Sequence, residues 1–485
     1  MTSARLWLSF AGGAGILVAL SVGACRKPGP DEIVYTGERR SPSDDPSSGG
    51  SSSPTGGSSG TSGTSSGASS GARGGTSGDA ATGGRDPNGS GGQGSSEAGA
   101  GGEAGRLDPG RQCPTVPVNS GTFSKRRLLE AVAACTVREL CFFQSHAATL
   151  RDRAATAASE PSEDAAAAAR EAWLTAMASW EGLELFQFGP AAASLNPGGQ
   201  GLRDRIYSWP LVARCKVDEQ VVNRFYANDA YFGSTSTSLT SGRTLHALEY
   251  LLFYSGTDNG CSAYSSINST GSWRSLGADE LRVRRRDYAA RAAADVWRQA
   301  ETLALSWSQD GGDFGPKLVE AGPVYASEQV ALNAVGNALF YLDTELKDSK
   351  IQVPLGLDVA CPTERCPDQV EALYARTSVD HIAQNLRGFR RLFQGCADGN
   401  AGFGFDDWLI AVGAGDLATR MLAALDAADA VVASLDTPLE VLIVNEPARV
   451  QAVNDAIKRI SDLLKTEFMA ALNIERPPGT PGDND

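Results

Sequence analysis

The hydrophobic positions of the chain recur every three or four residues over most of its second part. Glycine, proline or Asn/Asp clusters bound the later stretches, and no alternation of period two is long enough to indicate a sheet strand. This pattern predicts an all-α fold of antiparallel helical bundles. The predicted helical stretches are 124–150, 162–188, 277–308, 324–348, 367–394, 405–435 and 446–474.

A stretch rich in glycine and serine, 255–276, interrupts the helical pattern near its middle. Such residues favour loops, so we expect this stretch to separate two bundles. The chain from Cys113 onwards is long enough for two domains of ordinary size. We therefore expect a first helical bundle at 113–262 and a second at 263–485.

The first residues of the chain have the pattern of an export signal. Arg5 precedes an apolar stretch at 6–22, and small residues follow up to Cys25. This arrangement is typical of a secretory signal peptide, and the stretch is short and glycine-rich for a membrane span. We expect residues 1–24 to be the signal peptide.

The stretch LSVGAC at 20–25 resembles a bacterial lipobox, with Val22 where leucine is commoner. The resemblance implies cleavage before Cys25 and a lipid on its thiol. It places the protein in the cell envelope, anchored to the outer or inner membrane and facing the periplasm or the cell surface. The alternative is an ordinary signal peptide or an uncleaved anchor.

Glycine, serine and alanine dominate the next segment, 25–112. Its few apolar side chains cannot offset the entropy of ordering the backbone, so we expect a disordered tether. A Gly/Ser-rich chain of this length has a root-mean-square span of about 50 Å.

The cysteines and the charge narrow the functional class. Eight cysteines lie beyond Cys25, and an even number in an exported chain indicates disulfides. We expect Cys361 and Cys366, in CPTERC, to form a disulfide as a local pair. The chain contains no CxxC pattern, which argues against a zinc finger. The formal net charge of −14 argues against a nucleic-acid partner.

The apolar stretch SGRTLHALEYLLF at 241–253 contains two groups that can bind metals. His246 and Glu249 are three residues apart, so a helix places them on one face. An imidazole nitrogen with a carboxylate oxygen suits iron, zinc or manganese. On spacing alone, a hydrogen-bonded structural pair is the alternative.

Two further stretches carry candidate ligands. Glu181 and Glu184, in WEGLELFQFGP, repeat the three-residue spacing among large apolar groups. Two carboxylates held close together need a proton or a cation between them, although either could instead be exposed. In LRDRIYSWP, Asp204 could cap a helix, bind a metal, or pair with Arg203 or Arg205.

These stretches, in their order and spacing, resemble the imelysin family. The stretches SEQVALNAVGNALFYLDTELKDSKIQVPLGL and SVDHIAQNLRGFRRLFQG, followed by GFDDWL, extend the resemblance to about 120–475. It implies a pair of helical bundles with a site at their interface, built on a Gly-x-His-x-x-Glu motif. His246 and Glu249 match the last two motif residues, but Thr244 stands in place of the glycine.

By the same resemblance, acidic residues of the earlier helices join the histidine and the glutamate. Glu181, Glu184 and Asp204 are the matching positions, with Ser208 and Trp209 expected next to the ligands. The resemblance implies a bound metal ion, with iron favoured and zinc the alternative. It also implies a role in iron acquisition or handling, with envelope iron-uptake proteins as partners.

Two other functions stay open. A metal-dependent peptidase is the runner-up, but the patterns HExxH and HxxEH are both absent, so we expect a binding protein rather than an enzyme. A non-enzymatic surface interaction lipoprotein with a degenerate site is the third. We interpret the remaining histidines, His146 and His381, as packed or surface residues rather than ligands.

Overall fold

The computed structural model describes residues 112–118, 121–211, 213–233, 241–475 and 477. The expected signal peptide, Cys25 and all but the last residue of the expected tether lie outside these residues. The described residues form helices and no strand, which confirms the all-α prediction. None of the helices described combines the length and the apolar character that a membrane crossing requires.

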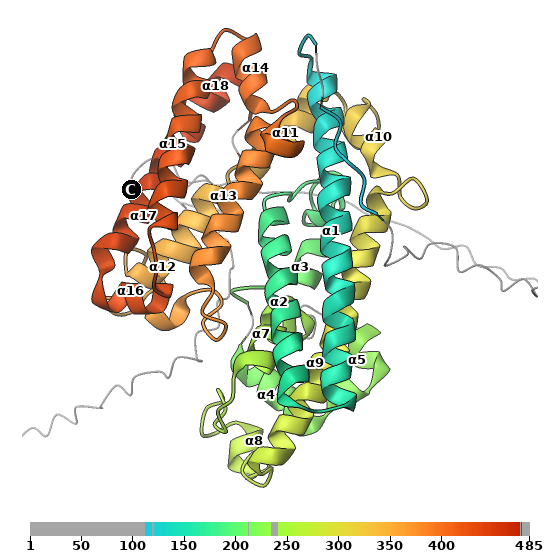
Figure 1. Ribbon diagram of the computed structural model, residues 1–485, viewed down its shortest axis with the longest axis vertical. Helices are drawn as coiled ribbons and strands as arrows, with labels where there is room; N and C mark the ends of the chain where they lie inside the picture. Colours follow the sequence, from blue (N-terminus) through green and yellow to red (C-terminus); the bar gives the residue numbers. More distant parts are fainter. Residues whose placement is uncertain (1–111, 119–120, 212, 234–240, 476, 478–485) are drawn as a thin grey trace, which may run out of the picture. The chain divides into compact units, whose positions relative to one another are not determined.

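Three long helices of the first half lie side by side (Figure 1): α1 (Lys125–Ser159), α2 (Glu163–Leu183) and α9 (Ala278–Trp307). The side chains of Ser124 and Ser162 accept a backbone hydrogen bond at the starts of α1 and α2, which satisfies amides that a helix start leaves unpaired. Helix α9 lies in the part of the chain expected to form the second bundle, from residue 263 onwards. In the structure it packs along α1 and α7 (Leu245–Phe253), which precede that boundary.

A second group of helices follows in the chain. Its long members are α13 (Ser378–Gln394), α15 (Gly415–Ala433) and α17 (Pro447–Leu463). Helix α15 packs against both α13 and α17. The shorter helices of the described residues are α3 (Leu202–Ile206), α4 (Arg214–Asn223), α5 (Asp229–Gly233), α8 (Ser266–Ser269), α10 (Phe314–Val319), α11 (Glu328–Ala338), α12 (Val353–Leu355), α14 (Phe405–Ala411), α16 (Leu439–Asn445) and α18 (Met469–Leu472).

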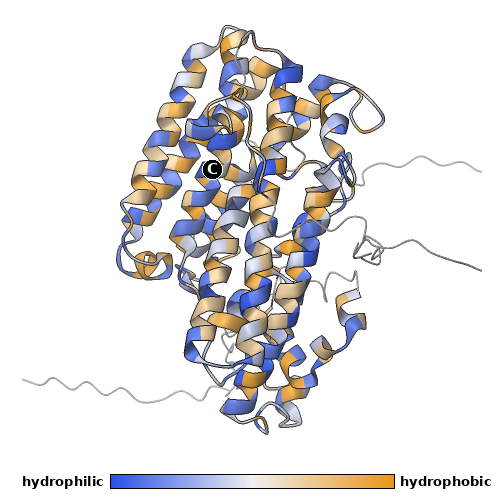
Figure 2. Cartoon of the chain, turned by 45° about the vertical axis from the view of Figure 1, so that its right-hand side comes forward, coloured by the Kyte–Doolittle hydropathy of each residue, from blue (hydrophilic) through white to orange (hydrophobic). Residues whose placement is uncertain are grey.

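The helices bury one face each, as their sequence periodicity predicts. Figure 2 shows hydrophobic residues recurring between hydrophilic ones along the helices. In α13 the buried residues Ile382, Leu386, Phe389 and Phe393 are spaced by four, three and four residues, which aligns them on one side. The described residues fall within one compact unit.

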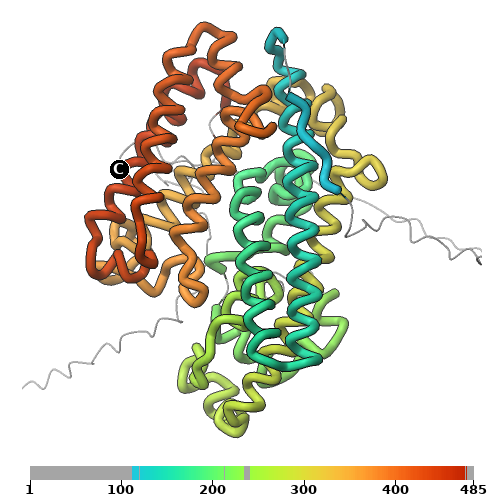
Figure 3. The backbone as a smooth tube through the Cα atoms, in the orientation of Figure 1, coloured from blue at the N-terminus to red at the C-terminus, as the bar shows by residue number. Residues whose placement is uncertain are grey.

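Helices α2 and α13, about 200 residues apart in the chain, touch each other directly (Figure 3). Glycines allow this close approach, because a Cβ atom at Gly388 would lie 2.5 Å from the carbonyl oxygen of Gly182. The side-chain amide of Asn385 donates to the carbonyl oxygen of Glu181 at 2.9 Å. This contact brings the acidic end of α2 against α13.

Several predicted helical stretches differ from the structure: α2 ends at Leu183 rather than at 188, and the stretch 405–435 forms two separate helices, α14 and α15. The stretch 324–348 contains α11 and then a π-helix, η4 (Leu342–Gln352), which runs four residues beyond the expected end. In the stretch 367–394, α13 starts only at Ser378. Ala372 and Arg376 have φ angles of 52° and 62°, a left-handed conformation that a right-handed helix excludes.

All eight cysteines of the described residues are paired in disulfides. Cys361–Cys366 is one of them, which confirms the predicted pair. Cys135–Cys396 joins α1 to the segment after α13 across 261 residues. The remaining disulfides are Cys113–Cys141 and Cys215–Cys261.

Candidate metal centre

The buried ammonium group of Lys350 contacts three carboxylates where α2, η4 and α13 meet. Lys350 Nζ lies 2.7 Å from Glu181 Oε2, 3.0 Å from Glu184 Oε2 and 2.9 Å from Glu371 Oε2. It also donates to Asn385 Oδ1 at 3.0 Å. The four charged side chains are at most 2% exposed. We call Glu181, Glu184, Lys350, Glu371 and His381 the acid–histidine centre.

Both carboxylate oxygens of Glu184 are already bound by protein groups. Arg203 donates to Oε1 at 2.6 Å, and the hydroxyl of Tyr341 donates to Oε2, which also faces Lys350. A buried carboxylate is stable in its ionised form only with such partners. Glu184 therefore serves as the counter-ion of Arg203 and Lys350.

His381 completes the centre from the first turn of α13. Its Nδ1 lies 3.1 Å from Glu371 Oε2 and 3.4 Å from Glu181 Oε1, and its side chain is 4% exposed. Its Nε2 lies 3.2 Å from Thr377 Oγ1 on the other side of the ring. The hydroxyl of Tyr207 donates to the remaining oxygen of Glu371.

Three atoms of the centre are buried without a hydrogen bond from any described residue: Glu181 Oε1, Glu371 Oε2 and His381 Nδ1. Lys350 forms an ion pair with Glu371 Oε2, and His381 Nδ1 lies within 3.4 Å of both Glu371 Oε2 and Glu181 Oε1, so these three atoms have no near polar partners beyond one another and Lys350 among the contacts described. Buried polar atoms normally have partners. Glu181, Glu371 and His381 each offer a ligand atom, and these atoms lie within 4.8 Å of one another, so the donor set fits a metal ion that prefers oxygen and nitrogen.

The carboxyl groups of the centre differ in charge. Burial, together with the charges of Glu371 and Glu184, raises the pKa of Glu181 well above its ordinary value, although Lys350 opposes this. Burial also acts to raise the pKa of Glu184 and of Glu371, but Lys350 outweighs it and lowers both, helped by Arg203 at Glu184 and by His381 at Glu371. The pKa shifts of the three carboxyl groups thus have opposite directions, upward at Glu181 and downward at Glu184 and Glu371.

The predicted pair on α7 lies beside the centre. His246 Nδ1 is buried without a hydrogen bond from the described residues, and burial lowers the pKa of His246 to about 4, against the opposing charge of Glu371. The imidazole is therefore neutral and has a lone pair available. Its ring lies 6.2 Å from the ring of Tyr207, the residue that binds Glu371.

Glu249 is occupied by backbone groups. Its Oε1 accepts hydrogen bonds from the amides of Tyr374 at 2.7 Å and Ala375 at 3.0 Å. Burial raises the pKa of Glu249 to about 7, although these two amides act in the opposite direction. Within the described residues, neither His246 nor Glu249 belongs to a group of three metal-capable residues with ligand atoms within 4.8 Å.

The candidates on the segment 202–210 do not enter the centre. Asp204 is 57% exposed and pairs with Arg203 at 3.0 Å. Ser208 Oγ lies 2.8 Å from Thr244 Oγ1 and thereby ties the segment to the start of α7. Trp209 is buried in the hydrophobic core. Thr244, at the position of the family glycine, is fully buried.

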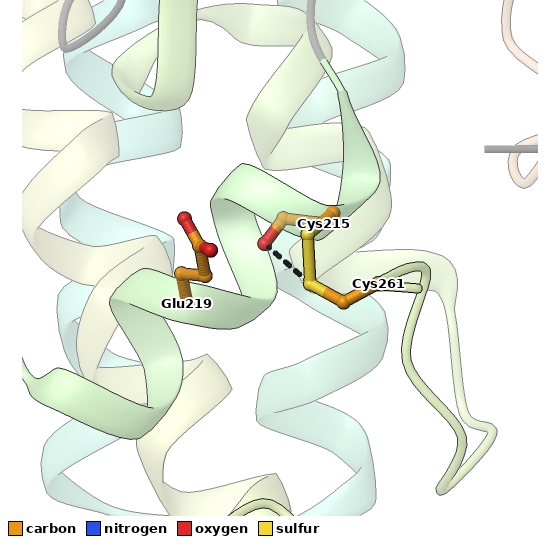
Figure 4. Close-up of side chains that lie close together, drawn as sticks. All are labelled: Cys215, Glu219 and Cys261. Carbon is orange, nitrogen blue, oxygen red and sulfur yellow. Dashed lines mark hydrogen bonds between the residues drawn. A yellow bond between two sulfur atoms is a disulfide. The ribbon is translucent and has the colours of Figure 1, made fainter. Parts of the chain in front are cut away.

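A second group of metal-capable residues, Cys215, Glu219 and Cys261, is shown in Figure 4. The two sulfurs are joined in a disulfide, so neither is available as a thiolate ligand. Glu219 pairs with Lys216 at 2.9 Å. This group is a structural cross-link rather than a metal site.

A cavity of about 580 Å³ lies on the outer side of His381, between α1, α2 and α13. Its lining includes His146, Glu171 and Asp380. A cavity of this size accommodates a small ligand or a hydrated ion, and His381 belongs both to its wall and to the centre.

Sequence reasoning missed three of the five residues of the centre. It interpreted His381 as a packed or surface residue and did not consider Glu371 or Lys350. It expected a proton or a cation between the close carboxylates and took the cation to be a metal ion, whereas Lys350 and Arg203 supply positive charge there. The available signal was that Lys350 and His381 both lie in stretches that carry the family resemblance.

The fold and the centre define an all-α protein with buried carboxylate and imidazole groups gathered between helices. Residues 142–466 match the family model described as Imelysin. Because this match covers more than half of the chain, the protein belongs to the imelysin family, as the sequence resemblance indicated.

Similar proteins agree with this assignment. The chain is 26% identical over 234 residues to the iron-regulated protein A of Synechococcus elongatus, a match that covers 47% of this chain and 52% of that protein. The chain thus spans about half the length of this curated relative.

Two solved structures share the fold. One is a protein of Parabacteroides distasonis described as a precursor of iron-regulated protein A, with 16% identity and a TM-score of 0.55 over 74% of this chain and 98% of that one. The other is an imelysin-like protein of Psychrobacter arcticum, with 20% identity and a TM-score of 0.54 over 75% and 99%.

Proposed function

We propose that this protein binds a metal ion, with iron favoured and zinc the alternative, in the acid–histidine centre, and that it acts in iron acquisition or handling in the cell envelope. The observation that carries the proposal is the set of three buried donor atoms without hydrogen bonds on Glu181, Glu371 and His381. Membership of the imelysin family and the name of the relative, iron-regulated protein A, support the iron-related role.

Of the ligands expected from the sequence, we retain Glu181 and place His246 next to the ion as a neutral imidazole. Glu371 and His381 complete the donor set. Glu184 and Asp204 stay outside it, because the oxygens of Glu184 are bound by other groups and Asp204 is exposed.

The burial of the centre favours ion binding over peptide hydrolysis. The side chains of Glu181, Glu371 and His381 are at most 4% exposed, and hydrolysis would require a polypeptide backbone beside the ion. A hydrated ion is far smaller, and His381 belongs both to the centre and to the wall of the neighbouring cavity.

Metal content of the full-length protein tests the proposal. After incubation with Fe²⁺ under anaerobic conditions, or with Zn²⁺, and removal of unbound ion, elemental analysis should find about one equivalent in the wild type. Glu371→Gln and His381→Ala should each retain much less, because each removes a ligand.

The matched control is His146→Ala, which removes a histidine that lines the cavity but lies outside the centre. It should bind as the wild type does. A wild-type protein with no bound ion above background would overturn the proposal. Equal loss of bound metal in Glu371→Gln, His381→Ala and His146→Ala would show that the ion does not bind in the acid–histidine centre.

We further propose that Cys25 carries a lipid that anchors the protein to a membrane. The apolar start of the chain and the lipobox-like LSVGAC support this. Metabolic labelling with a fatty-acid probe should mark the wild type, and Cys25→Ser should remove the label. Label that persists in Cys25→Ser would contradict the anchor.

A further inference from the structure

The segment 371–377 carries Glu371 and leads directly into the first turn of α13, where His381 lies. Its backbone is irregular, since Ala372 and Arg376 both have left-handed φ angles. Residues other than glycine adopt this conformation at an energetic cost and only where the surroundings impose it. The position of two residues of the centre therefore depends on whatever holds this segment in place.

The described contacts of the segment show what holds it. Glu249, on α7 of the first group of helices, accepts the amides of Tyr374 and Ala375 on a single oxygen at 2.7 and 3.0 Å. The ring of Tyr374 packs on Tyr250 and Tyr254, with ring centroids 5.2 and 5.3 Å apart. Helix α7 and the residue after it thus hold the middle of the segment, while Lys350 and Tyr207 contact Glu371 at its start and Glu440 pairs with Arg376 near its end.

We propose that Glu249 is a positioning residue, which fixes Glu371 and His381 by binding the backbone of the segment between them, and is not itself a metal ligand. The inference rests on the proposed metal site. It deepens that proposal by assigning separate roles to the two residues of the His-x-x-Glu pair: His246 faces the centre, and Glu249 holds the segment that completes it.

The hydrogen-bond capacity of Glu249 supports this assignment. A carboxylate oxygen has two lone-pair positions, and two amides occupy both positions on Oε1. Glu249 is 2% exposed, so loss of the carboxylate would leave two amides at a buried site without an acceptor, which proteins avoid. Among the described residues, Glu249 also belongs to no group of three metal-capable side chains whose ligand atoms lie within 4.8 Å of one another.

Two substitutions separate positioning from ligation. Glu249→Gln keeps a carbonyl oxygen that can accept both amides but removes the negative charge. Glu249→Leu has a similar volume and removes the acceptor. A direct ligand role requires the carboxylate, so both variants would then lose metal binding, whereas a positioning role requires only the acceptor.

The experiment measures two quantities on the full-length wild type and on both variants. The first is Zn²⁺ affinity by competition with a chelating dye. We expect Glu249→Gln to stay within about threefold of the wild type, and Glu249→Leu to bind roughly 10- to 100-fold more weakly, as for other residues that orient metal ligands. The second is hydrogen exchange of the metal-free protein over 371–378, which should be at least tenfold faster in Glu249→Leu and unchanged in Glu249→Gln.

Each outcome decides the inference. Equal loss of Zn²⁺ affinity in both variants, with unchanged exchange over 371–378, would overturn it in favour of ligation. If Glu249→Leu does not fold, Glu249→Gln alone decides, because retained affinity supports positioning and lost affinity contradicts it. If the wild type binds no ion, the proposed function fails, and the exchange measurement still shows whether Glu249 holds the segment.

Discussion

At the scale of single residues, Lys350 determines the charge balance of the centre. It is the shared partner of Glu181, Glu184 and Glu371, and all are buried. Removing one partner of a buried ion pair costs about 3–5 kcal/mol. Lys350→Met should therefore lower the melting temperature of the metal-free protein, and an added ion should raise it by more than in the wild type, since the ion takes over the missing charge.

A second buried lysine provides the control for Lys350→Met. Lys347 pairs with Asp343 at 3.1 Å in the same π-helix but is not part of the acid–histidine centre. Lys347→Met should also destabilise the protein, without an enhanced response to Fe²⁺ or Zn²⁺ in thermal melts. An equal metal response in the two variants would contradict the role given to Lys350.

Glu249 makes stability depend on pH in a defined direction. Its pKa of about 7 in the folded protein exceeds the value of about 4.3 expected in an unfolded chain. The folded state therefore holds the proton more tightly, so this contribution to stability is complete below pH 4.3 and is lost as pH rises towards and through 7. Glu249→Gln lacks the titration, so its stability relative to the wild type should rise by up to about 1.4 kcal/mol per pH unit in this interval. Urea unfolding of both proteins at pH 5, 6, 7 and 8 measures this change. A difference in the free energy of unfolding that stays constant with pH would contradict the raised pKa of Glu249.

At the scale of elements, long helices were predictable and the irregular segments were not. The starts of α1 and α2 follow from Ser124 and Ser162 with the apolar periodicity behind them. The segment 371–377 reads as helical by the same rules, because nothing in its composition demands left-handed backbone at Ala372. The segment is held by contacts with residues far away in the chain, among them Glu249, Lys350 and Glu440, so Glu371 could not be placed next to Glu181 from the sequence.

The left-handed backbone at Ala372 gives a prediction for this segment. Ala372→Gly relieves a conformational cost of about 1–2 kcal/mol, offset by the flexibility of glycine in the unfolded chain and the loss of a buried methyl group. Its free energy of unfolding should therefore stay within about 0.5 kcal/mol of the wild type. Ala423→Gly, at an exposed position inside α15, should lose about 1 kcal/mol. Equal losses in chemical denaturation would show that Ala372 is not strained.

At the scale of the whole molecule, the disulfides contribute unequally. Cys135–Cys396 closes a loop of 261 residues, and Cys361–Cys366 closes one of five. Chain entropy assigns about 5.5 kcal/mol to a loop of the first size and about 2 kcal/mol to one of the second. The double serine variant at 135 and 396 should therefore be the less stable of the two matched double variants in guanidinium unfolding. The reverse order would mean that strain in the folded state outweighs loop closure.

The separation of the centre along the chain has a consequence for the order of events during synthesis. Glu181 and Asn385 are hydrogen-bonded, yet they are 204 positions apart in the chain. At about 5–20 residues per second, roughly 10–40 s pass between the translation of the two. Until residue 350 is made, the acidic end of α2 lacks Lys350, and until the end of the interval it lacks α13, so it must remain in water. A chain released from a ribosome that stalls before residue 350 therefore cannot bury the carboxylates at the end of α2, because the lysine that neutralises them is missing.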